Sequence, residues 1–299
     1  MMKRLFISII GIFLSTYLCN AQLLWEISGK GMHTKSYIFA TDKLIPISFL
    51  DTVPQLYAIY AKCPIVVTEM LLNVDTRSKI EKAALLPLSQ NLRSFYDPTE
   101  CALIDTVLSA SLKMDFNQLA IFRPIFLTEL YKTELYKRYL GYEEEKSSEI
   151  FFQLVATEQG KRILPLDNAE EAIFSTFYRK NLDTQAQELL RLIENPEDEI
   201  EHKREQLQYY RKGLITDISY SIQAPANKTT INYIDYQAIV KRNARWATQI
   251  PALMKMGSCF IVLNVDYLGG DNGLLQMLRN EGYRVRPANR RIKLGKKKY

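Results

Sequence analysis

The sequence predicts an α/β fold: a mixed β-sheet built from the N- and C-terminal segments and covered by a largely helical middle region. Short β-rich runs lie near both ends of the chain, and the long stretch between them carries apolar residues at three- and four-residue spacing. The composition, 47% hydrophobic and 24% charged, is typical of a globular protein and excludes a disordered or coiled-coil chain.

The first 21 residues predict a secretory signal peptide. Lys3 and Arg4 precede an apolar run at 5–18, and the small residue Ala21 offers a point of cleavage. The run is shorter than the about 20 residues that a membrane span needs. We therefore expect an exported protein, periplasmic or secreted, with no transmembrane segment.

Four cysteines bound the redox chemistry of the chain. Cys19 lies in the signal segment, where lipidation is the alternative to cleavage, but the bulky Leu18 before it disfavours lipoprotein processing. Cys63, Cys101 and Cys259 remain in the mature chain, and this odd number allows at most one disulfide with the pairing left open. No two of them have the spacing of a metal site.

The strands and helices follow from local pattern. Each predicted strand is too short to stand alone, so the strands of the two ends must pair in one sheet. With no long linker rich in Pro, Gly or Ser, residues 22–299 are expected to form one domain. The predicted strands are 36–40, 64–68, 162–166, 259–263 and 283–286. The predicted helices include 102–114, 117–140, 149–158, 169–178 and 184–193.

Two charged segments are interpreted as solvated. Asn195 and Pro196 are suited to begin a helix that runs to residue 212, and Glu199 and Lys203 are spaced as an (i, i+4) ion pair. A solvent-facing helix explains this run better than a binding site. The tail 284–299 carries eight Lys and Arg and no acid. In an exported protein it favours a solvated terminus, and no nucleic-acid partner is expected.

Two segments share a short pattern that hints at an internal repeat. Residues 39–44 and 263–268 each follow an apolar run and contain Asp-x-Leu, with the acids at Asp42 and Asp266. Chance produces such a pattern often, so alone it decides nothing.

Six segments follow one another in the order and spacing of a known family. They are 24–29, 36–44, 65–70, 149–166, 242–246 and 260–283. The first two read LWEISG and SYIFATDKL, the third ends its strand in an acid, and the last contains a Gly-x-Asn-Gly turn. Over residues 22–287 the chain resembles the TraB/GumN family, whose animal relatives include the TIKI metalloproteases.

This resemblance implies a divalent-metal site for peptide hydrolysis. In the TIKI branch, two histidine motifs and acidic residues hold an ion that acidifies a water. Here Lys43 and Tyr267 stand at the two histidine positions, and Glu69 retains the acidic one. His33, which precedes the first predicted strand, and His202, in the charged helix, are interpreted as surface or turn residues.

The favoured hypothesis is a non-catalytic homologue with no cofactor, which binds a peptide or cell-envelope component through the former cleft. Lys43 would place its ammonium opposite Glu69, and this pairing would offset the cost of a buried carboxylate. Tyr267 would fill the second ligand position with a phenol that can form hydrogen bonds. Arg242, from the Arg-Asn pair that resembles the family's, belongs to the same group of former-site residues.

The alternative is an active metal-dependent peptidase with a rearranged site. Asp42, Asp266 and Glu69 would supply carboxylate ligands for Mn, Co, Zn or Mg. Asp42 and Asp266 each stand one residue before a lost histidine position. Since neighbouring residues of an extended strand point to opposite faces, these carboxylates would aim away unless the loops turn there.

Overall fold

The computed structural model describes residues 22–143, 148–223 and 230–288. The predicted signal segment, with Cys19, and the tail beyond residue 288 lie outside the described residues. Within the described ranges, no helix has both the length and the apolar character needed to cross a membrane.

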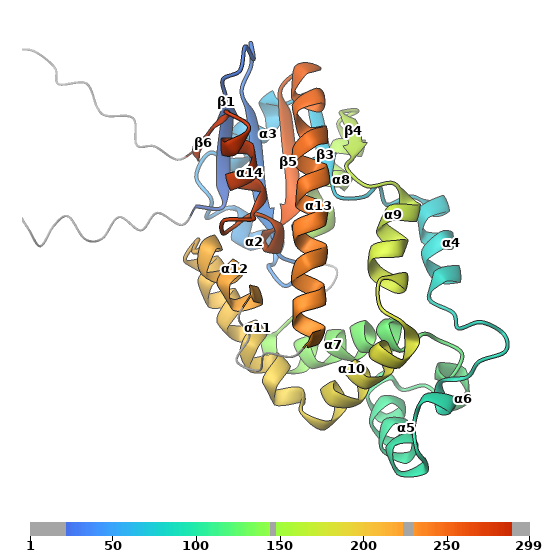
Figure 1. Cartoon of the computed structure of the whole chain (residues 1–299). Helices are drawn as coiled ribbons and strands as arrows, with labels where there is room; N and C mark the ends of the chain where they lie inside the picture. The colour runs from blue at the N-terminus through green and yellow to red at the C-terminus, as the bar shows by residue number, and fades with distance from the viewer. Residues whose placement is uncertain (1–21, 144–147, 224–229, 289–299) are drawn as a thin grey trace, which may run out of the picture.

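One six-stranded sheet confirms the predicted α/β architecture. Its strand order is β4-β3-β5-β2-β1-β6; the first four strands are mutually parallel, and β1 and β6 are each antiparallel to their neighbours (Figure 1). All five predicted strands are present, and β1 joins them. The strands are β1 (Leu24–Ser28), β2 (Ser36–Thr41), β3 (Ile65–Thr68), β4 (Arg162–Pro165), β5 (Cys259–Asn264) and β6 (Arg284–Pro287).

Helices account for most of the chain between the strands, as the periodicity predicted. α13 runs beside the sheet, while α7, α10 and α11 lie below the edge to which β2 and β5 point (Figure 1). The α-helices of the first half are α2 (Ile47–Leu50), α3 (Leu56–Lys62), α4 (Val74–Ala83), α5 (Pro98–Leu112), α6 (Phe116–Leu119) and α7 (Pro124–Leu140). Those of the second half are α8 (Ser148–Glu158), α9 (Ala169–Ile173), α10 (Leu182–Glu194), α11 (Pro196–Arg211), α12 (Ile215–Gln223), α13 (Thr230–Lys255) and α14 (Leu274–Asn280).

Two of the predicted helices differ from the observed ones. The segment 117–140 is divided into α6 and α7, because Pro124 begins a new helix and holds Arg123 before it in an extended conformation. The segment 169–178 consists of α9 and a π-helical turn, η3 (Phe174–Tyr178). Two short 3-10 helices complete the elements, η1 (Leu92–Phe95) and η4 (Val265–Tyr267).

The core has a sheet part and a helical part. Around the sheet, Phe39 and Phe260 pack against Phe152 of α8 with ring centroids 5.5 and 5.1 Å away. A second cluster, with Leu127 of α7 and Leu189 of α10 at its centre, joins α5, α6, α7 and α10. The three cysteines of the described chain are free thiols, so none of the possible disulfides is formed.

Helix α11 is not the solvated helix that its charge pattern predicted. Lys203 and Tyr210 are buried, and the Tyr210 hydroxyl donates to the carbonyl of Ala40 in β2 at 2.7 Å. Glu199 pairs with Lys132 of α7 at 3.1 Å instead of forming the predicted pair with Lys203. The (i, i+4) spacing describes only the helix itself, whereas both charges find partners on other elements.

We predict that Tyr210→Phe lowers the free energy of unfolding by about 1–2 kcal/mol, because it removes a buried hydrogen bond between α11 and β2. Urea unfolding at neutral pH measures this change. Tyr209→Phe is the matched control, since the Tyr209 hydroxyl donates to Glu205 on the exposed side of the same helix. Equal effects of the two substitutions would contradict the docking role of Tyr210.

Candidate functional site

An acidic residue follows each of the four parallel strands. Along the sheet edge these are Asp167 after β4, Glu69 after β3, Asp266 after β5 and Asp42 after β2. The carboxyl ends of parallel strands meet at one edge, which is where open α/β sheets bind their ligands. The structure therefore brings together four carboxylates, three of which the sequence analysis had singled out.

The two Asp-x-Leu segments leave the sheet side by side, because β2 and β5 pair in parallel with Thr41 opposite Asn264. Both chains turn at once. The Asn264 side chain accepts from the amide of Asp266 at 3.0 Å, and Asp42 accepts from the amide of Leu44 at 2.9 Å. These turns direct both carboxylates inward, so the alternation rule for an extended strand does not apply here.

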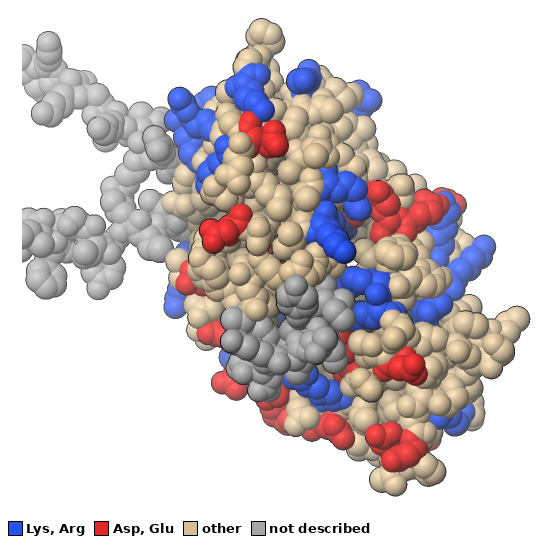
Figure 2. All heavy atoms as spheres, viewed as in Figure 1, with Lys and Arg blue, Asp and Glu red and all other residues tan. Residues whose placement is uncertain are grey.

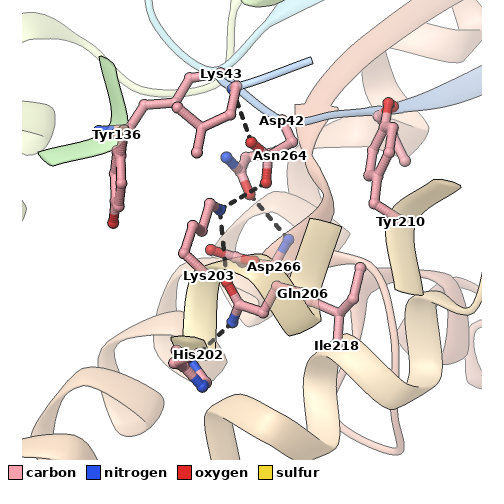
Figure 3. A network of polar contacts seen from close by, with 12 residues as sticks. Asp42, Lys43, Tyr136, His202, Lys203, Gln206, Tyr210, Ile218, Asn264 and Asp266 are labelled. Carbon is pink, nitrogen blue, oxygen red and sulfur yellow. Dashed lines mark hydrogen bonds and ion pairs between the residues drawn. The ribbon is translucent and has the colours of Figure 1, made fainter. Parts of the chain in front are cut away.

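The buried Lys203 of α11 lies between these two acids. Its Nζ donates to Asp42 Oδ2 at 2.7 Å, and Asp266 lies beside it (Figure 3). Burial alone would lower the pKa of Lys203, but Asp42 and Asp266 outweigh burial and raise it. The ammonium is therefore charged, and it neutralises Asp42 in the loop after β2 from inside the protein.

Asp266 is less well satisfied than Asp42. Its Oδ1 is buried without a hydrogen-bond partner among the described residues. Burial raises the pKa of Asp266, and the neighbouring Asp42 raises it further, while Lys203 opposes both. Asp266 thus holds its proton to higher pH than an ordinary aspartate.

Arg242 of α13 neutralises the other end of the acidic row. Its Nε donates to Asp167 Oδ2 at 2.6 Å, and its guanidinium lies 3.3 Å from Glu69 Oε2. The same guanidinium donates to the Tyr267 hydroxyl and packs over the Trp246 ring, 4.4 Å from the ring centroid. The Tyr267 phenol is thus part of an arginine-centred network.

The loop after β5, which contains Tyr267, is held by further contacts from α13. Burial raises the pKa of Tyr267 well above its ordinary value, so the phenol stays neutral and can accept from the guanidinium. The buried Asn243, next to Arg242 on α13, donates to the carbonyls of Tyr267 and Asn272 at 2.9 and 3.0 Å. Arg242 and Asn243 therefore position this loop together: Arg242 binds the Tyr267 side chain, and Asn243 binds two backbone carbonyls.

Lys43 does not have the partner that the sequence analysis gave it. Its Nζ donates to Glu129 Oε2 of α7 at 3.2 Å and lies 5.7 Å from the Tyr136 ring centroid. The cation against Glu69 is Arg242. The turn after β2 directs the lysine towards the helical region, whereas Arg242 approaches the sheet edge from α13.

A cavity of about 1390 Å³ opens beside these loops, between α7, α10, α11, α12 and α13. Asp266, Tyr267 and His202 lie in its wall. His202 was predicted to be a surface residue, but it is half-buried. The His202 ring lies 3.1 Å from Gln206, and burial lowers the pKa of His202. His33 is exposed, as expected.

The residues present do not fit the metal site that the resemblance implies. Across the described ranges, no three His, Cys, Asp or Glu side chains are grouped so as to hold an ion. Asp42 already pairs with the Lys203 ammonium, and Glu69 pairs with the Arg242 guanidinium while accepting from the Asn264 amide at 2.7 Å. A metal ion would have to displace these fixed cations.

Sequence reasoning missed two residues of this site. Asp167 receives Arg242, Arg245 and the Trp246 indole N–H, and its side chain is fully buried. The signal was present, since an acid directly after a predicted strand is the pattern that Glu69 also shows. Lys203 gave no such signal, because its neighbours along α11 are charged and its partner lies 161 residues away.

We predict that Asp266→Asn raises the free energy of unfolding at pH 7, and that this gain shrinks as the pH falls and disappears at about pH 3, below the unfolded pKa. A group whose pKa is raised on folding favours the folded state below its unfolded pKa, about 3.9, and loses that contribution as the pH rises. Urea unfolding at the two pH values measures the difference. Asp271→Asn, at an exposed position of the following loop, makes the same charge change as a control. A gain independent of pH would contradict the prediction.

Comparison with known proteins agrees with the resemblance drawn from the sequence. No curated protein and no solved structure matches the chain. A family model described as the TraB/PrgY/gumN family matches residues 23–287, which include all four strand-end acids, Lys203 and the Arg-Asn pair. The chain therefore belongs to the TraB/PrgY/gumN family.

Proposed function

We propose that this protein is an exported, non-catalytic member of its family, located in the periplasm or secreted, which binds a peptide or another cell-envelope component. The observation that carries the proposal is the neutralisation of the strand-end acids by the protein's own cations. Lys203 pairs with Asp42, and Arg242 pairs with both Glu69 and Asp167.

The energetics support binding over metal-dependent hydrolysis. Removing one partner of a buried ion pair costs about 3–5 kcal/mol, because the remaining charge is left uncompensated. A divalent ion that bound Asp42 or Glu69 would have to bear a comparable cost to displace Lys203 or Arg242. The second motif position adds a neutral phenol engaged by Arg242.

The cavity beside the motif loops gives the ligand a place. Its volume, about 1390 Å³, exceeds the 300–1,000 Å³ of ordinary small-molecule pockets, so several residues of a peptide could enter it. Backbone carbonyls and amides of a peptide would find donors and acceptors on its polar walls, which include Tyr209, Tyr220 and Gln208.

A metal-dependent peptidase is the second candidate, and Asp266 favours it. The Oδ1 atom of this residue has no hydrogen-bond partner in the described structure, and the pKa of its carboxyl group is raised, as in many acid–base groups of active sites. Asp42 lies close enough to contribute to that shift. Such a peptidase would require Lys203 to move away from both carboxylates.

We predict that the purified protein binds Mn, Co, Zn and Mg ions without defined stoichiometry up to millimolar concentration, since its strand-end acids are already paired. Titration calorimetry and metal analysis after gel filtration measure this. Glu69→Gln is the diagnostic variant. One tightly bound equivalent of metal in the wild type, lost in Glu69→Gln, would overturn the non-catalytic proposal.

We further predict that the protein retains peptides without cleaving them. The protein is incubated with a tryptic digest of serum albumin and about 1 mM Mn²⁺, a concentration at which even weak metal sites are partly occupied. Mass spectrometry of the bound fraction should then show enriched, intact peptides. New peptide termini that disappear on chelation would contradict the proposal, and so would a bound fraction with the same composition as the digest.

A further inference from the structure

A small apolar pocket adjoins the large cavity. It has a volume of about 200 Å³ and lies between α4, α7, α9 and η3. Its apolar walls include Met70, Ile80, Phe126, Ile173 and Phe177. Since Met70 directly follows Glu69, the pocket begins next to the strand-end acids.

The size and lining of this pocket define what it can accept. A dry cavity of about 150 Å³ lined by Leu, Ile and Phe is large enough to hold benzene. A pocket of about 200 Å³ with a comparable lining therefore accommodates one phenyl or branched aliphatic side chain. Larger apolar groups would have to extend into the polar cavity.

Glu129 stands where the pocket and the cavity meet, because both are lined by Glu129 and Ile125. Desolvation by the surrounding helices raises the pKa of Glu129, but the nearby Lys43 and Lys132 outweigh this effect and lower the pKa, so the carboxylate is ionised. Its side chain is 47% exposed although it accepts from Lys43, so a cation of a bound ligand can reach it from the solvent side.

The large cavity carries an excess of negative charge. Its described lining includes nine Asp and Glu but five Lys and Arg. Several of these bases are already paired within the wall, for example Lys132 with Glu199 and Lys180 with Asp235. Figure 2 shows acidic atoms along the lower edge of the visible face, in the region of α11. Such a surface favours a cationic ligand.

The π-helical turn η3 shapes the pocket. π turns are rare and occur frequently at functional sites. Here the turn places Phe177 in the pocket wall and leaves Thr176 exposed at the rim, while α9 before it contributes the buried Ala172. The wall is thus part of a continuous helical segment, a stable support for a binding pocket.

We propose that this pocket receives an apolar side chain of a bound peptide whose adjacent residue is cationic and pairs with Glu129. The inference rests on the proposed peptide-binding function and adds the class of peptide: an aromatic or branched aliphatic residue next to a Lys or Arg. The pocket selects the apolar residue by size, and Glu129 selects its neighbour by charge.

Three acetylated and amidated hexapeptides test the proposal. They are identical except for a central Lys-Phe, Lys-Ser or Glu-Phe pair, and their binding is measured by titration calorimetry. The Lys-Phe peptide should bind at least about tenfold more tightly than either of the others, a difference of about 1.4 kcal/mol. Equal affinities for the three peptides would overturn this inference and leave general peptide binding in place.

Matched variants locate the effect. Ala172→Phe fills the pocket and should remove the preference for Phe, while Ala58→Phe, at an exposed position of α3, should preserve it. Thr176→Trp blocks the rim without altering the core, so it tests the pocket even if Ala172→Phe fails to fold. A Phe preference that survives Thr176→Trp would place the apolar subsite elsewhere and overturn the proposal.

The charge preference has its own pair of variants. Glu129→Gln should remove most of the difference between the Lys-Phe and Glu-Phe peptides, and Glu134→Gln, on the same helix but outside both cavities, should leave it unchanged. Mass spectrometry of the recovered peptides separates the test of the subsite from the test of the non-catalytic function. Cleavage of the Lys-Phe peptide would defeat the non-catalytic proposal while supporting the subsite.

Discussion

The parallel pairing of the strands β4, β3, β5 and β2 is the constraint on which the rest of the site depends. It places the acids Asp167, Glu69, Asp266 and Asp42 in one row, where like charges repel and burial is costly. A row of this kind is stable only if cations lie against it. In this protein the cations come from the covering helices, Lys203 from α11 and Arg242 from α13.

The two helices meet this requirement in different ways. On α13, a planar guanidinium contacts two carboxylates and a phenol at once, as the fork of donors on Arg242 allows. On α11, a single ammonium on Lys203 binds Asp42, and among the described residues the Oδ1 atom of Asp266 has no hydrogen-bond partner. The β4 side of the edge is therefore fully paired, and the charge imbalance that remains is concentrated at the wall of the large cavity.

Local sequence patterns predicted the fold better than the site. The strands at 36–40 and 259–263 follow from their β-branched and aromatic residues, and Pro124 marks a helix start once the residue before it is considered. The parallel register that places Asp42 beside Asp266 depends on contacts between segments more than 200 residues apart. The shared Asp-x-Leu pattern follows these two paired strands, but a pattern so short could not be separated from chance.

The partners of charged side chains were the least predictable feature. Lys43 was expected opposite Glu69 because the family resemblance implied that both stand at metal-ligand positions. A lysine side chain is long, so the direction of its loop decides its contact, and here the loop leads to Glu129. Lys203 lay in a segment whose spacing described an exposed helix. Ion pairs between distant elements leave no periodic trace in a single sequence, so only the tertiary structure identifies them.

Asp266 links the chemistry of the edge to recognition in the cavity. Burial and Asp42 raise the pKa of its carboxyl group against the effect of Lys203, so Asp266 holds less negative charge than an ordinary aspartate near its titration range. The Asp266 carboxyl group lies in the wall of the large cavity at the sheet edge, whereas the ionised Glu129 stands where that cavity meets the apolar pocket. If the protein binds a peptide as proposed, Glu129 would pair with the cationic side chain at the mouth of the apolar pocket, and the sheet edge at Asp266 would lie beside the rest of the ligand.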